Sequence, residues 1–116
     1  MSKVTIGKMN AISVFSAWLL LPSAFLLLGY QKYFGNPDAS AMPFIYLFGA
    51  FFASAAAHLV LAYFVRCPSC SKCITVQGFK KPHPSSEGDW SKVVWNWFSG
   101  SVVCIHCGSR VNTNAL

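Results

Sequence analysis

The sequence is organised around two short cysteine pairs, Cys67-Pro68-Ser69-Cys70 and Cys104-Ile105-His106-Cys107-Gly108. A CxxC segment places two thiolates on one tight turn, and two such turns facing each other supply the four tetrahedral sulfur ligands that a structural Zn²⁺ prefers. The pairs are 33 residues apart in a chain with only five cysteines, and cysteines buried merely as small apolar groups have no reason to fall in paired turns. The pattern therefore predicts one metal site with four ligands: Cys67, Cys70, Cys104 and Cys107.

The composition of the chain changes at about residue 66. Hydrophobic residues make up 54% of the 116 residues and charged residues 10%, but most of the charge follows the apolar part. A chain of this length has room for one small domain and a membrane segment, but not for a large soluble core with a deep active site. We therefore expect a short N-terminal segment (1–10), a membrane hairpin (11–65) and a small domain (66–116).

Two uncharged stretches are long enough to cross a bilayer as helices. Residues 11–30 include Pro22, and residues 43–65 are interrupted only by His58. An α-helix needs about 20 apolar residues to cross the hydrocarbon layer. The connection 31–42 carries a Gly-Asn-Pro-Asp turn signal, so the two spans are expected to form an antiparallel hairpin. A cleaved signal peptide is the alternative for the first stretch, which is, however, longer than a typical signal core.

The basic residues flanking the spans predict the orientation. Lys3 and Lys8 precede the first span, four more basic residues follow the second within residues 66–81, and the connection has only Lys32. The positive-inside rule then places both termini in the cytoplasm and the connection outside. A reducing cytoplasm would also keep the cysteines available as thiolate ligands. We expect an integral membrane protein of the bacterial inner membrane.

The second span carries small residues at regular spacing. Gly49, Ala53 and Ala57 recur every fourth residue, which allows two helix backbones to approach closely in lipid. This face is expected to pack either on the first span or on a different protein.

His58 is the only strongly polar side chain in either span. At its expected depth the first span presents Ser13 and Ser16, so we expect a neutral His58 hydrogen-bonded to one of these hydroxyls or to a backbone carbonyl. Haem ligation, quinone contact and proton transfer are the functional alternatives.

The C-terminal part is expected to be β-rich. Residues 78–91 are rich in Gly, Pro, Ser and charged residues and predict a mobile loop. A helix over 90–98 is the alternative to a strand there, because Trp90, Val94 and Trp97 also match helical spacing. The stretches that predict strands, from their β-branched and aromatic residues, are 74–77, 92–98 and 101–105.

This arrangement resembles the zinc-ribbon family, in which two cysteine knuckles clamp one metal above a small antiparallel sheet. The resemblance covers roughly residues 66–112. Cys107-Gly108 matches the family's usual turn, whereas Ser71 stands where Gly is common in the first knuckle. The resemblance implies a metal-stabilised recognition or scaffold module. The expected fold class is a two-helix membrane hairpin followed by a β-rich zinc ribbon whose stability comes mostly from the metal.

Other residues near the knuckles are expected to have lesser roles. Cys73 is expected to be a free thiol, with exchange for Cys70 or support of an iron cluster as alternatives. His106 is expected to be an exposed turn residue and His83 part of a solvated loop. The aromatic residues of this part suit either the ribbon core or a lipid or partner surface: Trp90, Trp95, Trp97 and Phe98.

No enzyme is expected, because the sequence offers no nucleophile with a base, paired carboxylates, phosphate loop or open metal position. The expected function is protein–protein interaction by a small membrane protein, as an accessory subunit or adaptor of a membrane complex. Its partners would be the lipid bilayer and a membrane protein or a second copy of the chain, with no small-molecule substrate.

Two alternative functions use the same residues. Four thiolates also bind iron in rubredoxins, which would make the chain a membrane-anchored electron carrier. A nucleic-acid-binding ribbon could use Lys80, Lys81 and Lys92 with nearby tryptophans. Residues 66–116 carry a net charge of +4, and a Zn²⁺ with four thiolates lowers this to about +2, which makes nucleic acid the less suitable partner.

Overall fold

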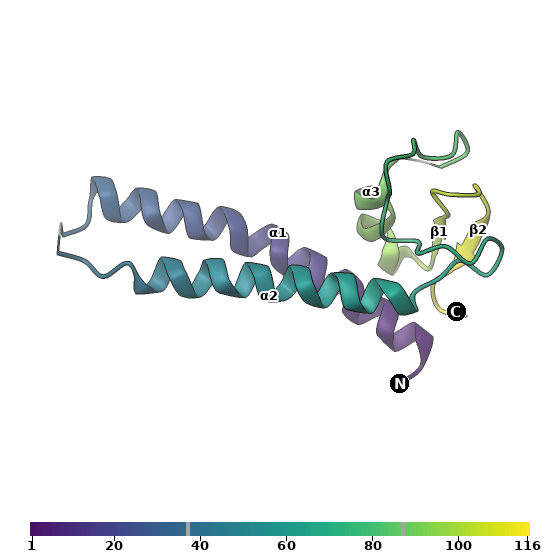
Figure 1. Ribbon diagram of the computed structural model, residues 1–116, viewed down its shortest axis with the longest axis horizontal. Coiled ribbons are helices and arrows are strands. Elements are labelled where there is room, and N and C mark those ends of the chain that lie inside the picture. Colours follow the sequence, from purple (N-terminus) through teal and green to yellow (C-terminus); the bar gives the residue numbers. More distant parts are fainter. Residues whose placement is uncertain (37, 87) are drawn as a thin grey trace.

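The computed structural model describes residues 1–36, 38–86 and 88–116, so Pro37 of the predicted turn and Glu87 of the predicted loop lie outside the described residues. Two long helices, α1 (Lys3–Tyr33) and α2 (Met42–Phe64), form an antiparallel hairpin. A C-terminal module, residues 65–116, packs against the end of the hairpin near both chain termini (Figure 1). Its elements are the helix α3 (Trp90–Trp95), the 3₁₀ turn η1 (Trp97–Ser99) and the antiparallel strands β1 (Ser101–Val103) and β2 (Arg110–Asn112).

Helix α1 begins earlier than the uncharged stretch predicts. The Ser2 hydroxyl caps the helix by accepting the Thr5 backbone N–H at 3.2 Å, and the helix then runs for 31 residues through Pro22. At 1.5 Å per residue this length is about 46 Å, against about 30 Å for the hydrocarbon layer of a bilayer. Helix α1 is therefore long enough to cross a membrane and to extend well beyond it.

Helix α2 matches the second predicted span closely. Pro43 lies in its first turn, where the missing N–H costs nothing, and the helix ends at Phe64. Both α1 and α2 are long and apolar enough to cross a membrane.

The two helices pack through large side chains. The Phe25 ring of α1 lies 6.2 Å from that of Phe44 and 6.5 Å from that of Phe48, centroid to centroid. The small-residue face of α2 is exposed instead, at Gly49, Ala53 and Ala57. A Cβ added to Gly49 would have no neighbour within 4 Å. The face that allows close helix approach is therefore directed away from α1.

The module and the N-terminal third of α1 share one hydrophobic core. Ala11 and Val14 of α1 belong to the same buried cluster as Val94 and Trp97 of the module. Trp97 is only 1% exposed, and its ring lies directly against the backbone of Gly7. The first part of the predicted span 11–30 thus serves as a docking surface for the module.

Gly7→Ala is expected to destabilise this docking, because the new Cβ would lie 2.5 Å from Cζ2 of the buried Trp97 ring. Overpacking of this kind costs about 1–3 kcal/mol. Gly29→Ala is the matched control in the same helix, since nothing lies within 4 Å of its added Cβ. Thermal unfolding followed by near-ultraviolet circular dichroism measures both; equal stability of the two variants would contradict the docking.

The strand predicted over 92–98 was wrong, and the helical alternative holds for most of this segment. The Asp89 carboxylate accepts the Ser91 backbone N–H and begins α3, and Gly100, with φ of 97°, ends η1 before β1. Within this segment Val93, Val94 and Trp97 are buried. Packing of these side chains on α1, at helical spacing, favours the helix.

The other strand predictions were partly right. Strand β1 forms within the predicted 101–105, and its partner is β2, which had not been predicted; Val102 pairs with Val111. The strand predicted over 74–77 was wrong, since these residues form no strand, and the isolated bridge between Arg66 and Cys73 ends just before them. Within the loop predicted over 78–91, His83 is hydrogen-bonded to the second knuckle, because its backbone N–H donates to the Ile105 carbonyl at 2.7 Å.

Candidate metal centre

The two knuckles have the same backbone geometry. The Cys67 N–H donates to the Lys72 carbonyl at 2.9 Å, and the Cys104 N–H donates to the Ser109 carbonyl at 2.8 Å. In both knuckles the residue after the second cysteine donates back to the carbonyl of the first, at 2.9 Å. These residues, Ser71 and Gly108, have φ of 59° and 74°. Ser71 thus adopts the left-handed conformation that glycine usually provides at this position.

The fold brings the four predicted cysteines together. Their sulfur atoms all lie within 4.8 Å of one another, and none of the four is in a disulfide. The Sγ atoms of Cys67 and Cys107 are 3.7 Å apart, as are those of Cys70 and Cys104. A tetrahedral Zn²⁺ with Zn–S bonds of about 2.3 Å requires sulfur atoms about 3.8 Å apart. The cluster therefore has the composition and spacing to hold a metal ion.

Hydrogen-bond donors surround the sulfur atoms. The Ser109 hydroxyl lies 3.0 Å from Cys107 Sγ and 3.6 Å from Cys67 Sγ. Donors of this kind stabilise the negative charge of a four-thiolate site. Backbone N–H groups add to them: those of Cys70 and Ser69 donate to Cys67, and those of His106 and Cys107 donate to Cys104.

The four thiols differ in acidity before a metal binds. Burial raises the pKa of Cys104 to about 12 and also raises the pKa of Cys70. Burial opposes ionisation of Cys67 as well, but the N–H donors and the Ser109 hydroxyl outweigh it and lower the pKa of Cys67 to about 6. The Ser109 hydroxyl and backbone N–H lower the pKa of Cys107. The site thus combines two thiols whose pKa is lowered with two whose pKa is raised and which hold their protons at neutral pH.

Zinc uptake at pH 7 is expected to release at least two protons per ion, because Cys70 and Cys104 are still protonated and must become thiolates. As the pH falls through the pKa of Cys67, about 6, this thiol is protonated too, so proton release rises and affinity falls more steeply. Calorimetry in buffers of different ionisation enthalpy counts the protons. Release of fewer than about one proton at pH 7 would contradict the assignment.

The remaining residues near the knuckles have structural contacts. Cys73 lies outside the four-sulfur cluster, and its carbonyl lies 2.9 Å from His106 Nε2. The Val76 carbonyl is 3.2 Å from the same nitrogen. The expectation of an exposed His106 was therefore wrong: it is half-buried and links the second knuckle to the segment after the first. His83, predicted to be solvated, is also half-buried and lies against Gly108.

A second polar site joins the hairpin to the module. His58 Nδ1 lies 2.8 Å from Asn10 Oδ1, and Asn10 Nδ2 donates to Thr75 Oγ1 at 2.8 Å. Asn10 and Thr75 are both 0% exposed. Because the amide oxygen only accepts, the proton in the first bond is on His58 Nδ1. The His58 ring also stacks on Trp90, with centroids 5.8 Å apart.

The expected partner of His58 was therefore wrong. Ser13 donates to the Asn10 carbonyl at 2.7 Å instead of to His58, and Asn10 takes the role predicted for Ser13 or Ser16. Asn10 is the last residue of the expected N-terminal segment 1–10, so it lies outside the span in which partners of His58 were expected. Docking of the module over this part of α1 buries it.

The aromatic residues divide between the two expected roles. Trp97 is buried in the core, whereas Trp95 is 65% and Phe98 54% exposed. These two exposed rings lie beside Phe15 of α1, with centroids 5.9 and 6.3 Å from it. Trp18 of α1 continues the aromatic cluster, 6.4 Å from Trp95. An aromatic surface thus runs from α1 onto α3 and η1.

Comparison of the sequence with protein-family models, curated proteins and solved structures gave no match. The likeness to zinc ribbons is carried by the knuckles. The chain thus combines two long apolar helices and a small two-stranded module with a four-cysteine cluster that could hold a metal ion.

Proposed function

We propose that this chain is an integral membrane protein whose zinc-bound module is held at the cytoplasmic surface to contact another membrane protein, as an accessory subunit or adaptor. The observation that carries the proposal is the close packing of the module on the hairpin. Only Val65 and Arg66 separate α2 from Cys67, and the module shares a core with α1. A module held in this way presents its surface in one orientation relative to the bilayer.

The exposed side chains of the hairpin support its insertion in lipid. Large apolar residues project from the part remote from the module, and they include Leu19, Phe25, Leu26, Ile45 and Phe52. From Phe15, beside the aromatic surface, to Tyr33 at the end of α1 is about 27 Å of helix, close to the ~30 Å of the hydrocarbon layer. Tyr30 and Tyr33 are exposed at the far end, as expected of an interfacial aromatic belt.

The charge distribution supports a cytoplasmic module. Lys3, Lys8 and Arg66 lie at the module end of the hairpin, and Lys32 is the single basic residue near the other end. This asymmetry favours the cytoplasm for the module end. The cytoplasm also keeps thiol ligands reduced.

Zinc is the proposed metal, and the proposed role is binding rather than catalysis. Four thiolates complete a tetrahedral coordination sphere, so no position is left for a substrate or an activated water. Elemental analysis of the purified protein tests the metal directly. One zinc per chain in a colourless sample is expected, and a red, iron-containing sample would replace the proposal with electron transfer.

The exposed small-residue face of α2 supports a partner within the membrane. Gly49, Ala53 and Ala57 lie side by side on a face that α1 does not cover. Such faces associate through close backbone packing in lipid, where apolar burial gives little driving force. A transmembrane helix of the partner could pack there while the module contacts its cytoplasmic part.

The experiment is purification of the tagged chain from native membranes in a mild detergent, followed by identification of proteins present in equal amounts. A membrane protein is expected to copurify with the wild-type chain and to be lost with Ala53→Leu. Leu59→Phe is the control, because it enlarges an exposed side chain on a different face of α2. A chain that runs alone, or only with copies of itself, would overturn the adaptor proposal.

A further inference from the structure

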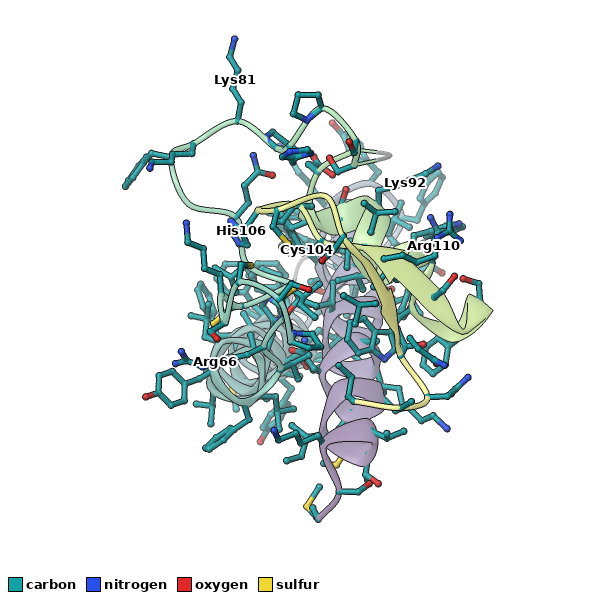
Figure 2. All side chains as sticks on the ribbon, turned by 90° about the vertical axis from the view of Figure 1, so that its right-hand side faces the viewer. Arg66, Lys81, Lys92, Cys104, His106 and Arg110 are labelled. Atoms are coloured by element: carbon teal, nitrogen blue, oxygen red, sulfur yellow. The ribbon has the colours of Figure 1, made fainter. Side chains whose placement is uncertain are left out.

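A pocket of about 210 Å³ lies between the α3–η1 segment and the two strands. Lys92, Asn96 and Ser99 line one wall and lie on one face of this segment, at helical spacing. Ser101 and Arg110 line the other wall, and Arg110 Nη1 lies 3.4 Å from Ser101 Oγ. Figure 2 shows Lys92 and Arg110 on the same side of the module, away from Arg66 and Lys81.

We propose that this pocket binds the phosphate group of an anionic phospholipid. The two cations can share its charge, and the Ser101 hydroxyl and the Asn96 side-chain amide, which also line the pocket, can donate to its remaining oxygens. Charge-assisted bonds of this kind are among the strongest that a protein offers to a phosphate, and the guanidinium group suits its geometry especially well. The acidic side chain closest in sequence to Lys92, Asp89, is engaged at the start of α3, where it accepts the Ser91 N–H.

The position of the pocket favours a lipid as the source of the phosphate. Helix α3 is the part of the module nearest to the far end of the hairpin (Figure 1), and it carries the exposed Trp95. Phe98, also exposed, follows within η1. Aromatic rings of this kind settle at headgroup level, and basic groups beside them attract anionic lipids. This step rests on the membrane insertion proposed above.

The test uses the full-length, zinc-loaded chain in a neutral detergent, with bound lipid counted by native mass spectrometry. Phosphatidylglycerol is titrated against phosphatidylcholine, inorganic phosphate and a single-stranded oligonucleotide. We expect one phosphatidylglycerol to bind about tenfold more tightly than phosphatidylcholine. The double variant Lys92→Gln/Arg110→Gln should lose this preference, whereas Lys80→Gln/Lys81→Gln removes the same charge from an exposed loop and should keep it within about twofold.

Several results would overturn the inference. They are a wild-type chain without preference, an equal loss in the two double variants, or inorganic phosphate or the oligonucleotide binding as tightly as the lipid through the same two residues. Zinc content and thermal stability are measured first for every variant. If the double variant does not fold, Lys92→Gln and Arg110→Gln are compared singly.

The solubility of the chain distinguishes failure of the membrane proposal from failure of the lipid-binding inference. A chain recovered from cells in the soluble fraction without detergent would refute insertion, whatever the pocket binds. A chain that needs detergent but shows no lipid preference would refute only the pocket.

Discussion

Replacing Cys104 by serine is expected to abolish metal binding and to unfold the module. Cys104 is 0% exposed and supplies one of the four sulfur atoms, and a serine hydroxyl is a poor substitute for a thiolate on Zn²⁺. Structural zinc contributes on the order of 10–16 kcal/mol in small zinc modules, as much as the whole stability of a typical domain. Elemental analysis should fall from one metal per chain to none, and the near-ultraviolet signal of the buried Trp97 should be lost.

The matched control for this variant is Cys73→Ser. Cys73 is a neighbouring cysteine outside the four-sulfur cluster, and its backbone carbonyl, which serine keeps, lies 2.9 Å from His106 Nε2. This variant should keep its metal and its near-ultraviolet spectrum. Metal loss in Cys73→Ser, or full metal content in Cys104→Ser, would show that the ligand set is wrong.

The two long helices should survive the loss of the metal. Their backbone hydrogen bonds are internal to each helix, and in detergent they do not depend on the knuckles. Far-ultraviolet circular dichroism of Cys104→Ser should therefore retain most of its helical signal. This separates unfolding of the module from unfolding of the whole chain.

The second large effect is expected for Asn10→Leu, which should loosen the joint between hairpin and module. Leucine has a similar volume but leaves the His58 N–H and the Thr75 hydroxyl without their partner. Each buried polar group left unpaired costs about 1–3 kcal/mol, so the expected loss for the two groups is about 2–6 kcal/mol. Hydrogen exchange and limited proteolysis of the module measure the loss, because opening of the joint exposes its backbone.

Ser13→Ala is the control for Asn10→Leu. The Ser13 hydroxyl donates to the Asn10 carbonyl of its own helix, so its removal should change stability by no more than about 0.5 kcal/mol. A double-mutant cycle of Asn10→Leu with His58→Leu measures the coupling between the two side chains. Additive effects would mean that the contact between Asn10 and His58 contributes nothing to the joint.

The sequence alone was sufficient for the features that depend on near neighbours in the chain. Pro43 and the uncharged run after it predict α2 almost to the residue, because helix formation and membrane length are both read from consecutive side chains. The knuckles are similar: the CxxC spacing brings two sulfur atoms onto one turn wherever it occurs. The structure adds that the two turns face each other, since Cys67 Sγ lies beside Cys107 Sγ and Cys70 Sγ beside Cys104 Sγ.

The tertiary structure decided what depends on contacts between distant segments. Residues 90–98 satisfy both strand and helix spacing, and packing of Val94 and Trp97 on α1 selects the helix. In the sequence Asn10 is a polar residue of a short polar segment. In the fold the module covers it, and Thr75, more than sixty positions away in the chain, accepts a hydrogen bond from its side chain. Propensity is a property of a short window, whereas burial and hydrogen-bond partners are properties of the assembled fold, so only the fold could assign them.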